Sequence, residues 1–280
     1  MEQATKQALQ IFATKARMGV LDGVYHAKAG HPGGSLSICD VLSYLYNVRM
    51  HVEPKDPKMP DRDRLVLSKG HAAPALYAAL ALKGFFPVED LKTLRKSDSY
   101  LQGHPNMDKV PGVDMSTGSL GQGISAAVGM ALGAKLDKAD YHVYAILGDG
   151  ELQEGQVWEA AMFAGNHGLS NLTAIIDNNN LQIDGTMDEV NAPYPIAVKF
   201  RAFNWNTVEI DGHDFDALES AFAAADACKD KPTAIVMKTV KGKGVSFMEN
   251  AVGWHGSAPN TEQYEQAMAQ LNAALAELEA

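Results

Sequence analysis

Residues 142–155 read HVYAILGDGELQEG, an apolar run that ends in an aspartate between two glycines. The apolar part, 142–147, predicts a buried strand. In an open parallel sheet, ligands bind just beyond the carboxyl ends of the strands. The glycines would let the backbone approach a ligand, and Asp149 is a hard oxygen ligand suited to Mg²⁺ or Ca²⁺. Taken alone, the pattern fits an acidic turn that binds nothing equally well.

A second polar stretch follows the next predicted strand. Residues 172–177 are apolar up to Asp177, and Asn178-Asn179-Asn180-Leu181 comes next. The 29 residues between Asp149 and Asn179 are about the length of one βαβ crossover. A carboxylate, an amide oxygen and a backbone carbonyl would leave octahedral positions on a metal for two phosphate oxygens and a water. The two strand ends therefore predict a site for a divalent metal and a diphosphate.

The rest of the chain predicts an α/β fold, with a parallel twisted sheet covered by helices on both faces. Further strands are expected at 65–68, 207–210 and 233–239. Helices are expected at 5–27, 35–49, 88–96, 121–136, 156–165 and 214–227, with an alanine-rich helix after His71. The stretches 51–63 and 97–117 read as loops. Because no composition shift marks a boundary, we expect one domain over residues 1–280.

A last helix is expected at about 261–278, where apolar residues recur at helical spacing. Our first expectation is that it folds back on its own domain, and the alternative is that it packs on a partner helix.

The composition of the chain excludes several classes of protein. With 34 acidic and 24 basic residues, the chain has no basic stripe that would bind nucleic acid. The chain has only two cysteines, Cys39 and Cys228, which are too few for a disulfide framework and are not spaced as in a zinc knuckle. We expect both to be small residues of the hydrophobic core. No signal peptide or membrane-length apolar run is present, so a cytoplasmic location is expected.

Four of the nine histidines lie beside glycines in predicted loops, namely His31, His71, His104 and His255. A single loop histidine is usually just solvated, but four in the same setting suggest a shared role. A zinc site is the rival use, and no His-Glu-x-x-His or comparable pair occurs.

Gly-Asp-Gly with a downstream Asn-Asn resembles the thiamine diphosphate-binding motif. Along nearly the whole chain, the order of motifs resembles the transketolase family. The segments that show this resemblance are the histidine loops, residues 150–165, and the stretches STGSLGQG at 116–123 and KGKGVSFM at 241–248.

The resemblance implies a role for each matched residue. The metal, Mg²⁺ or alternatively Ca²⁺ or Mn²⁺, would be bound by Asp149, Asn179 and the Leu181 carbonyl. The cofactor would be contacted by His71, His255, Gly118, Ser119, Leu120, Gly150, Glu151 and Asn179. The catalytic set would be His31, His104, His255 and Glu154, with the histidines facing the sugar and Glu154 at a subunit interface. Neutral imidazoles with an ordinary pKa near 6.5 would suit proton shuttling.

The resemblance also implies a partner. Members of the family normally carry a second α/β domain, which supplies the glutamate for the aminopyrimidine and the arginines for the sugar phosphate. We find no candidate for that glutamate here, so we expect a separate C-terminal, pyrimidine-binding subunit in an α₂β₂ heterotetramer, with the cofactor bridging the two chains. The expected reaction is the two-carbon ketol transfer between sugar phosphates of the pentose phosphate pathway.

Several alternatives stay open. Within thiamine enzymes, these are an α chain of a 2-oxo acid dehydrogenase, a deoxyxylulose phosphate synthase, or a transketolase specialised for a sulfosugar or for a branched sugar phosphate such as apulose phosphate. The His-Pro pairs at 31–32 and 104–105 favour sugar handling over the dehydrogenase. A non-catalytic binding subunit would be expected to lack a metal ligand or histidine, and all are present. No Gly-x-Gly-x-x-Gly follows a strand, which disfavours a dinucleotide-binding protein.

Overall fold

A computed structural model describes all residues from 1 to 280. Its centre is a five-stranded sheet in the order β1-β2-β3-β5-β4, and every neighbouring pair is parallel. The strands are β1 (Arg64–Leu67), β2 (Val143–Gly148), β3 (Leu172–Asn178), β4 (Asn206–Asp211) and β5 (Thr233–Lys238). The predicted α/β class with a parallel sheet is confirmed.

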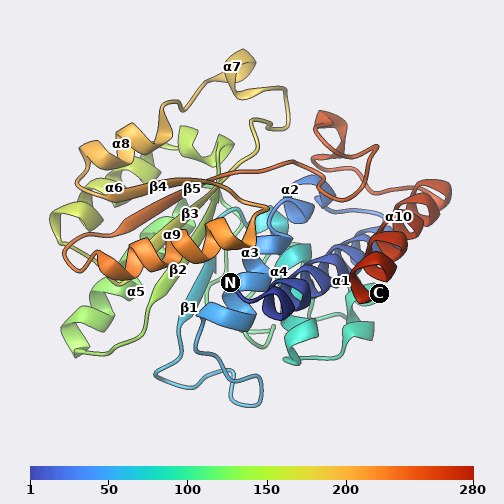
Figure 1. Cartoon of the computed structure of the whole chain (residues 1–280), viewed down its shortest axis with the longest axis horizontal. Helices are drawn as coiled ribbons and strands as arrows, with labels where there is room; N and C mark the ends of the chain where they lie inside the picture. The colour runs from blue at the N-terminus through green and yellow to red at the C-terminus, as the bar shows by residue number, and fades with distance from the viewer.

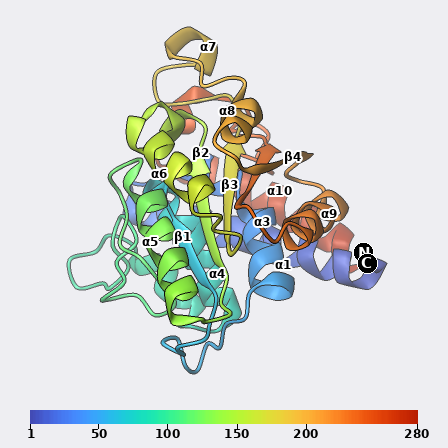
Figure 2. The same cartoon turned by 90° about the vertical axis from the view of Figure 1, so that its left-hand side faces the viewer.

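Helices cover both faces of this sheet (Figures 1 and 2). They are α1 (Gln3–Ala27), α2 (Pro32–Leu36), α3 (Cys39–Tyr44), α4 (Ala73–Lys83), α5 (Gln122–Asp137), α6 (Gly155–Asn166), α7 (Met187–Val190), α8 (Ile196–Ala202), α9 (Phe215–Ala227) and α10 (Thr261–Glu279). Short 3-10 turns lie at Gly70–Ala72, Val88–Thr93, Gly150–Gln153 and Val252–Trp254, and a π-turn at Leu45–Arg49.

The side chains of each strand alternate between two hydrophobic cores. Tyr144 and Ile146 of β2 pack into the core shared with α1, α3, α4 and α9. Val143, Ala145 and Leu147 of the same strand pack into the opposite core, under α5, α6 and α8. Because successive residues of a strand point to opposite faces, an unbroken apolar run is what a strand covered on both sides requires. Because the strands are parallel, the carboxyl ends of these apolar segments all lie at the same edge of the sheet.

The last helix, α10, lies along α1 and thus extends the first core. The Tyr264 ring stacks on Tyr25 with centroids 4.1 Å apart, and the Tyr264 hydroxyl donates to Asp22. Leu271 is buried in the same core. The expectation that this helix folds back on its own domain is confirmed.

The sequence-based prediction of one helix over 35–49 is wrong. Pro32 begins the first helical turn, as its fixed backbone angle favours. The chain then breaks at Ser37 and Ile38 before α3 starts. At the break, the Ser37 hydroxyl donates to Asp177 at the end of β3, so the interruption brings a polar group to the sheet edge.

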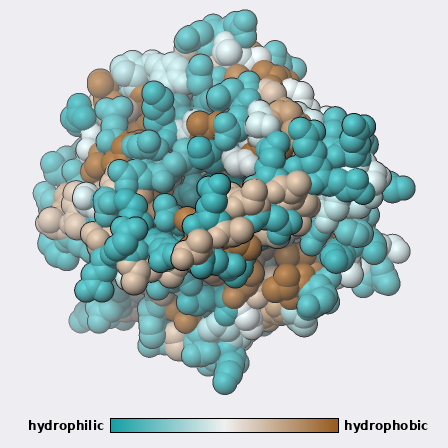
Figure 3. Space-filling view, turned by 45° about the vertical axis from the view of Figure 1, so that its right-hand side comes forward, coloured by the Kyte–Doolittle hydropathy of each residue, from teal (hydrophilic) through white to brown (hydrophobic).

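Smaller differences have local causes. The predicted helix at 88–96 is a 3-10 turn, Val88–Thr93, which ends where Leu94 leaves the helical region. Cys39 is buried as expected, whereas Cys228 is only partly buried. No helix is both long and apolar enough to span a lipid bilayer. The face in Figure 3 is mainly hydrophilic, with its hydrophobic residues in small separate patches.

Candidate active site

The ends of β2 and β3 meet, as the sequence predicts. Gly148 of β2 pairs with Asp177 of β3, and the residue that follows β2, Asp149, points across this junction. One carboxylate oxygen of Asp149 accepts from the Asn180 amide at 2.6 Å, and the other accepts from the Gly150 amide at 2.9 Å. Asn180 has a φ of 63°, a left-handed conformation that asparagine tolerates well. The two loops are thereby tied together around Asp149.

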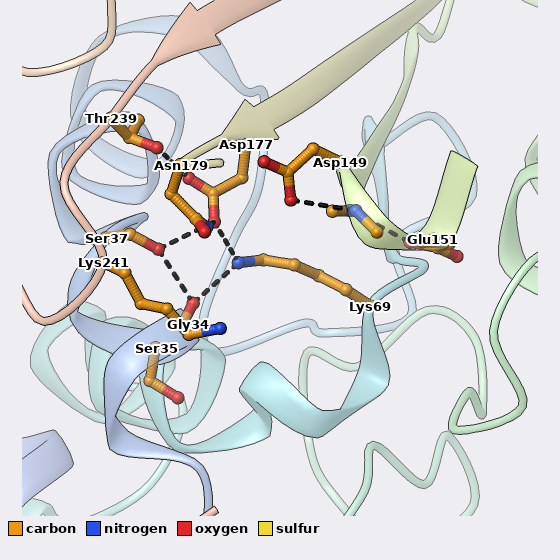
Figure 4. A network of polar contacts seen from close by, with 12 residues as sticks. Gly34, Ser35, Ser37, Lys69, Asp149, Glu151, Asp177, Asn179, Thr239 and Lys241 are labelled. Carbon is orange, nitrogen blue, oxygen red and sulfur yellow. Dashed lines mark hydrogen bonds and ion pairs between the residues drawn. The ribbon is translucent and has the colours of Figure 1, made fainter. Parts of the chain in front are cut away.

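Asp177 is the centre of a buried polar network at this junction (Figure 4). Its carboxylate accepts from Ser37 Oγ at 2.7 Å, Lys69 Nζ at 2.6 Å and Asn179 Nδ2 at 2.8 Å, and also from the Thr239 hydroxyl. Burial alone would raise the pKa of Asp177, but the Lys69 charge and these donors hold it below its ordinary value. The Asn179 amide nitrogen is engaged by Asp177, and its oxygen accepts from the Leu181 amide at 3.1 Å, which leaves the second lone pair of this oxygen for a metal.

Glu151 joins three further segments. Its carboxylate accepts from Ser68 Oγ at 2.5 Å and from the amides of Gly121 at 2.9 Å and Gly148 at 3.1 Å. These donors come from the ends of β1 and β2 and from the start of α5. Although the side chain is buried and faces the cleft, its oxygens are already satisfied within the protein.

The four loop histidines gather at one place. The ring of His31 lies 5.3 Å from His71, 6.4 Å from His104 and 5.5 Å from His255, measured between centroids. Lys241 Nζ donates to His255 Nδ1 at 2.9 Å, so His255 carries its proton on Nε2. The cluster combines residues from four distant loops, and their shared role stays a prediction.

The electrostatic setting keeps the imidazoles neutral. Burial, then the charges of Arg95 and His104, lowers the pKa of His31 to about 4. Burial, then Lys241, lowers the pKa of His255 to about 3. The pKa values of His71 and His104 are lowered as well, chiefly by burial. The ordinary pKa of 6.5 assumed from sequence is therefore too high, because the sequence does not reveal burial or neighbouring cations.

The segment that contains Lys241 is anchored to the helical layer by a chain of hydrogen bonds. The preceding Val240 amide donates to His213 Nε2 at 2.9 Å, and His213 Nδ1 donates to Asp40 at 2.6 Å. Asp40 also pairs with the buried Arg17 at 2.5 Å. Asp40 and Arg17 lie on α3 and α1, so the segment after β5 is attached to the helical layer as well as to the sheet.

These groups line a cleft of about 360 Å³ beyond the ends of β2 and β3. Its walls include Asp149, Asn179, Leu181, His71 and His255. A larger and more open groove, about 1030 Å³, lies on the other side of the Asn178–Leu181 loop and contains none of the histidines. The smaller cleft is therefore the place where most of the residues predicted from the sequence gather.

Residues 9–275 match the family model described as the thiamine diphosphate binding domain of transketolase. The chain belongs to the transketolase family. The predicted family and transferase class are confirmed, and the chain corresponds to the N-terminal subunit of this family.

Two relatives in the transketolase family match the chain over nearly their full length. The 6-deoxy-6-sulfo-D-fructose transketolase subunit of Clostridium sp. (strain MSTE9) is 49% identical over 94% of this chain and 96% of its own. The apulose-4-phosphate transketolase subunit of Phocaeicola vulgatus is 44% identical over 98% of this chain and 97% of its own. The solved transketolase of Campylobacter jejuni superposes with a TM-score of 0.90 at 34% identity, over 99% of this chain and 46% of that one. The chain therefore spans less than half the length of the solved transketolase.

The donor groups in the cleft fit a metal-bound diphosphate. Burial, then the charge of Asp177, raises the pKa of Asp149 to about 7, although two backbone amides and the charge of Lys241 act in the opposite direction; a bound cation would stabilise this carboxylate further. No cluster of three or more His, Cys, Asp or Glu side chains suited to a metal exists. A metal here would instead take Asp149, Asn179 and the Leu181 carbonyl, leaving positions for phosphate oxygens.

The structure brings nearly all the predicted site residues into the cleft. His31, Gly118, Leu120, Gly150, Glu151 and Glu154 line it together with the groups named above. His104 lies behind Gly118, where an added Cβ would meet its ring at 3.2 Å. Ser119 lies outside the cleft lining, so its contact with the cofactor stays a prediction.

Several polar residues of the site were not predicted from the sequence. Lys69, Asp177, Lys241 and Gln182 line the cleft, but none was singled out. Asp177 carried a signal, since a charged residue ending an apolar strand needs a partner when buried. Lys69 and Lys241 lie within motifs that were recognised for their glycines and histidines. For Gln182 the sequence held no signal.

Proposed function

We propose that this chain, with a separate subunit, transfers a two-carbon ketol unit from a ketose to an aldose by means of thiamine diphosphate. The observation that carries the proposal is the meeting of Asp149 and Asn179 beside four converging histidines. When bound, the cofactor supplies a carbon nucleophile and an electron sink for carbon–carbon bond cleavage. The protein supplies binding, orientation and proton movement.

The diphosphate would be held through a divalent ion, for which we propose Mg²⁺, with Ca²⁺ or Mn²⁺ as alternatives. Asp149 and Asn179 would bind the ion through side-chain oxygens and Leu181 through its carbonyl. Lys241 Nζ donates to this carbonyl at 2.9 Å, and a carbonyl oxygen has a second lone pair for a metal. For Gly150 we propose a backbone contact with the diphosphate, in which its amide, which donates to Asp149 at 2.9 Å, would be shared with a phosphate oxygen.

His71 and His255 would contact the diphosphate, while His31, His104 and His255 would face the sugar. Because His255 carries its proton on Nε2, it is a donor toward a bound oxygen. Burial disfavours the cationic form of these imidazoles, and a bound anion would raise their pKa values. Proton transfer by these groups would therefore follow the binding of cofactor and substrate.

A second chain would complete the site. Glu154 is exposed at the start of α6, and Met162 and Phe163 of the same helix are 56% and 41% exposed. Exposed large apolar side chains close to a site favour a subunit contact there. We propose an α₂β₂ assembly in the cytoplasm, in which the partner provides the carboxyl group for the aminopyrimidine. Binding of cofactor to this chain alone is expected to be weak.

A specialised sugar substrate is a second candidate. The two relatives matched over nearly their full length are named for a sulfosugar and for apulose 4-phosphate, rather than for a pentose phosphate. No arginine lines the cleft itself, and Arg95 is the arginine whose charge reaches the sugar-facing His31 and His104. We propose that the partner supplies further groups that recognise a phosphate or sulfonate on the sugar. The same half-site would then serve any of these ketoses.

The deciding experiment combines the chain with the protein encoded beside it, thiamine diphosphate and Mg²⁺. A panel of ketose donors, including xylulose 5-phosphate, sulfofructose and apulose 4-phosphate, is paired with aldose acceptors. We expect two-carbon transfer with at least one pair, and none from either chain alone. Failure of every pair, with a folded complex that binds the cofactor, would reject the proposal.

A further inference from the structure

Gln182 presents an unused hydrogen-bonding group to the cleft. Two side-chain nitrogens of cleft residues, His31 Nδ1 and Gln182 Nε2, are buried without any hydrogen-bond partner. A buried donor left without an acceptor destabilises a folded protein. Such a group in a folded protein calls for an explanation, and an acceptor supplied by a ligand is one. His31 already has a proposed role, whereas Gln182 has none.

The position of Gln182 is fixed by its surroundings. It directly follows Leu181, whose carbonyl faces Lys241, and its own backbone amide donates to the Gly185 carbonyl at 2.9 Å. A Cβ placed on Gly150 would come within 3.2 Å of the Gln182 Cβ. The glutamine side chain therefore starts beside Gly150, on the wall that faces the proposed metal and phosphate groups.

Both lysines of the cleft already have hydrogen-bond partners, so the neutral side chain of Gln182 is a donor that remains available to a ligand. Lys69 is engaged by Asp177 and by the Gly34 carbonyl at 2.7 Å. Lys241 is shared between Leu181 and His255. A diphosphate offers many acceptor oxygens, and the side-chain amide of Gln182 has two N–H groups with no competing acceptor.

We propose that Gln182 binds the diphosphate of the cofactor by donating its side-chain amide to a phosphate oxygen. This inference rests on the proposed function, because it assumes that a diphosphate enters the cleft. A donor to a charged oxygen contributes about 1.5–3 kcal/mol, which corresponds to roughly a 10- to 100-fold change in affinity.

Titration calorimetry of the chain with Mg²⁺, alone and in complex with its partner subunit, tests the assignment. Thiamine diphosphate and inorganic pyrophosphate are titrated separately, at millimolar concentration because weak binding is expected. Gln182→Leu should weaken both ligands by the same factor, about 10-fold or more. It should leave the ligand-free protein as stable as before or more stable, because an unsatisfied donor is removed. Gln102→Leu is the matched control: its amide donates to the Ser99 carbonyl away from the cleft, and both affinities should stay unchanged.

Each other outcome overturns the inference in a recognisable way. If the wild-type chain binds neither ligand in a metal-dependent manner, alone and in complex with its partner subunit, the proposed function falls and this inference falls with it. If the wild type binds both and Gln182→Leu binds equally well, only the role of Gln182 falls. Loss of thiamine diphosphate affinity alone would place the amide against the organic part of the cofactor. Gln182→Glu should bind more weakly still through charge repulsion, and equal or tighter binding would mean that the side chain accepts from a metal-bound water.

Discussion

Two aspartates end neighbouring strands of the same sheet, and their surroundings differ sharply. Asp177 is fully buried and receives four side-chain donors, one of them the ammonium group of Lys69. Asp149 is almost as buried, at 2% exposure, but receives only two backbone amides. The pKa of Asp177 lies below its ordinary value, whereas the pKa of Asp149 is raised to about 7.

The difference teaches that burial alone does not distinguish a structural carboxylate from one that awaits a ligand. A buried charge is tolerated when donors or an opposite charge surround it, and Asp177 has both. Asp149 has no side-chain donor and no ion-pair partner in contact, and the charge of Lys241 offsets only part of the effect of burial. We infer that Asp177 holds the site together and that Asp149 is left available to a metal.

The largest expected effect comes from removing the structural carboxylate. Asp177→Ala would leave the ammonium of Lys69, which is 1% exposed, without its counter-charge, and should lower the free energy of unfolding by about 3–5 kcal/mol. Urea unfolding measures this loss. The double variant Asp177→Ala with Lys69→Met should recover much of it, because no isolated charge remains. A loss below about 1 kcal/mol in the single variant would break the contrast between the two aspartates.

Removing the other carboxylate should act on binding instead. Asp149→Ala should weaken metal-dependent binding of thiamine diphosphate by more than about 100-fold, since mutation of partners around a metal already weakens binding 10- to 100-fold. Calorimetry with and without Mg²⁺ measures it. Asp184→Ala, an exposed aspartate of the same loop region, is the control. Unchanged affinity in Asp149→Ala would remove this residue from the metal shell.

The pH dependence of stability provides a sharper contrast. Since the pKa of Asp149 is about 7 when folded and near 3.8 when unfolded, the folded state binds more protons between these values. Its ionisation therefore destabilises the metal-free protein progressively as pH rises through that range. Asp149→Asn should stabilise the protein in EDTA by roughly 1–3 kcal/mol at about pH 8 and by much less at about pH 4. Thermal melts at the two pH values measure this, and a variant less stable at the higher pH would contradict the assignment.

The smallest effect is expected from removing one of the four hydrogen-bond donors around Asp177. Ser37→Ala removes one of four hydrogen bonds and should lower the free energy of unfolding by about 1 kcal/mol. Ser220→Ala, which removes an exposed hydroxyl bonded within α9, should change it by a few tenths. Cofactor affinity should fall little in Ser37→Ala, because Lys69 and Asn179 still hold the carboxylate. A loss as large as that of Asp177→Ala would show that the donors do not act as a redundant set.

Sequence patterns predicted the sheet because each strand is an apolar run buried on both faces, as in Val143–Gly148 and Leu172–Asn178. They failed at 35–49, where a helical pattern of apolar residues is interrupted by Ser37. At the interruption, the Ser37 hydroxyl donates to Asp177, 140 residues further along the chain. Local periodicity carries no information about such a partner.

The site shows the same limit. Gly-Asp-Gly and Asn-Asn marked the proposed metal ligands because glycines and turns leave a local signature. Lys69 and Lys241 were not predicted as site residues, because a lysine is expected at the surface and only the fold shows that these two are buried. The depressed pKa values of His31 and His255 were equally hidden, since each depends on burial and on cations from other loops.

The bond from Val240 to His213 has a consequence for how the cleft captures its ligand. Through Asp40 and Arg17, this bond fastens the backbone next to Lys241 to two helices of the core. The conformational entropy of ordering that wall is lost when the protein folds, before any cofactor arrives. A ligand entering from solution meets a preorganised wall, and a larger part of its contact energy then appears as affinity.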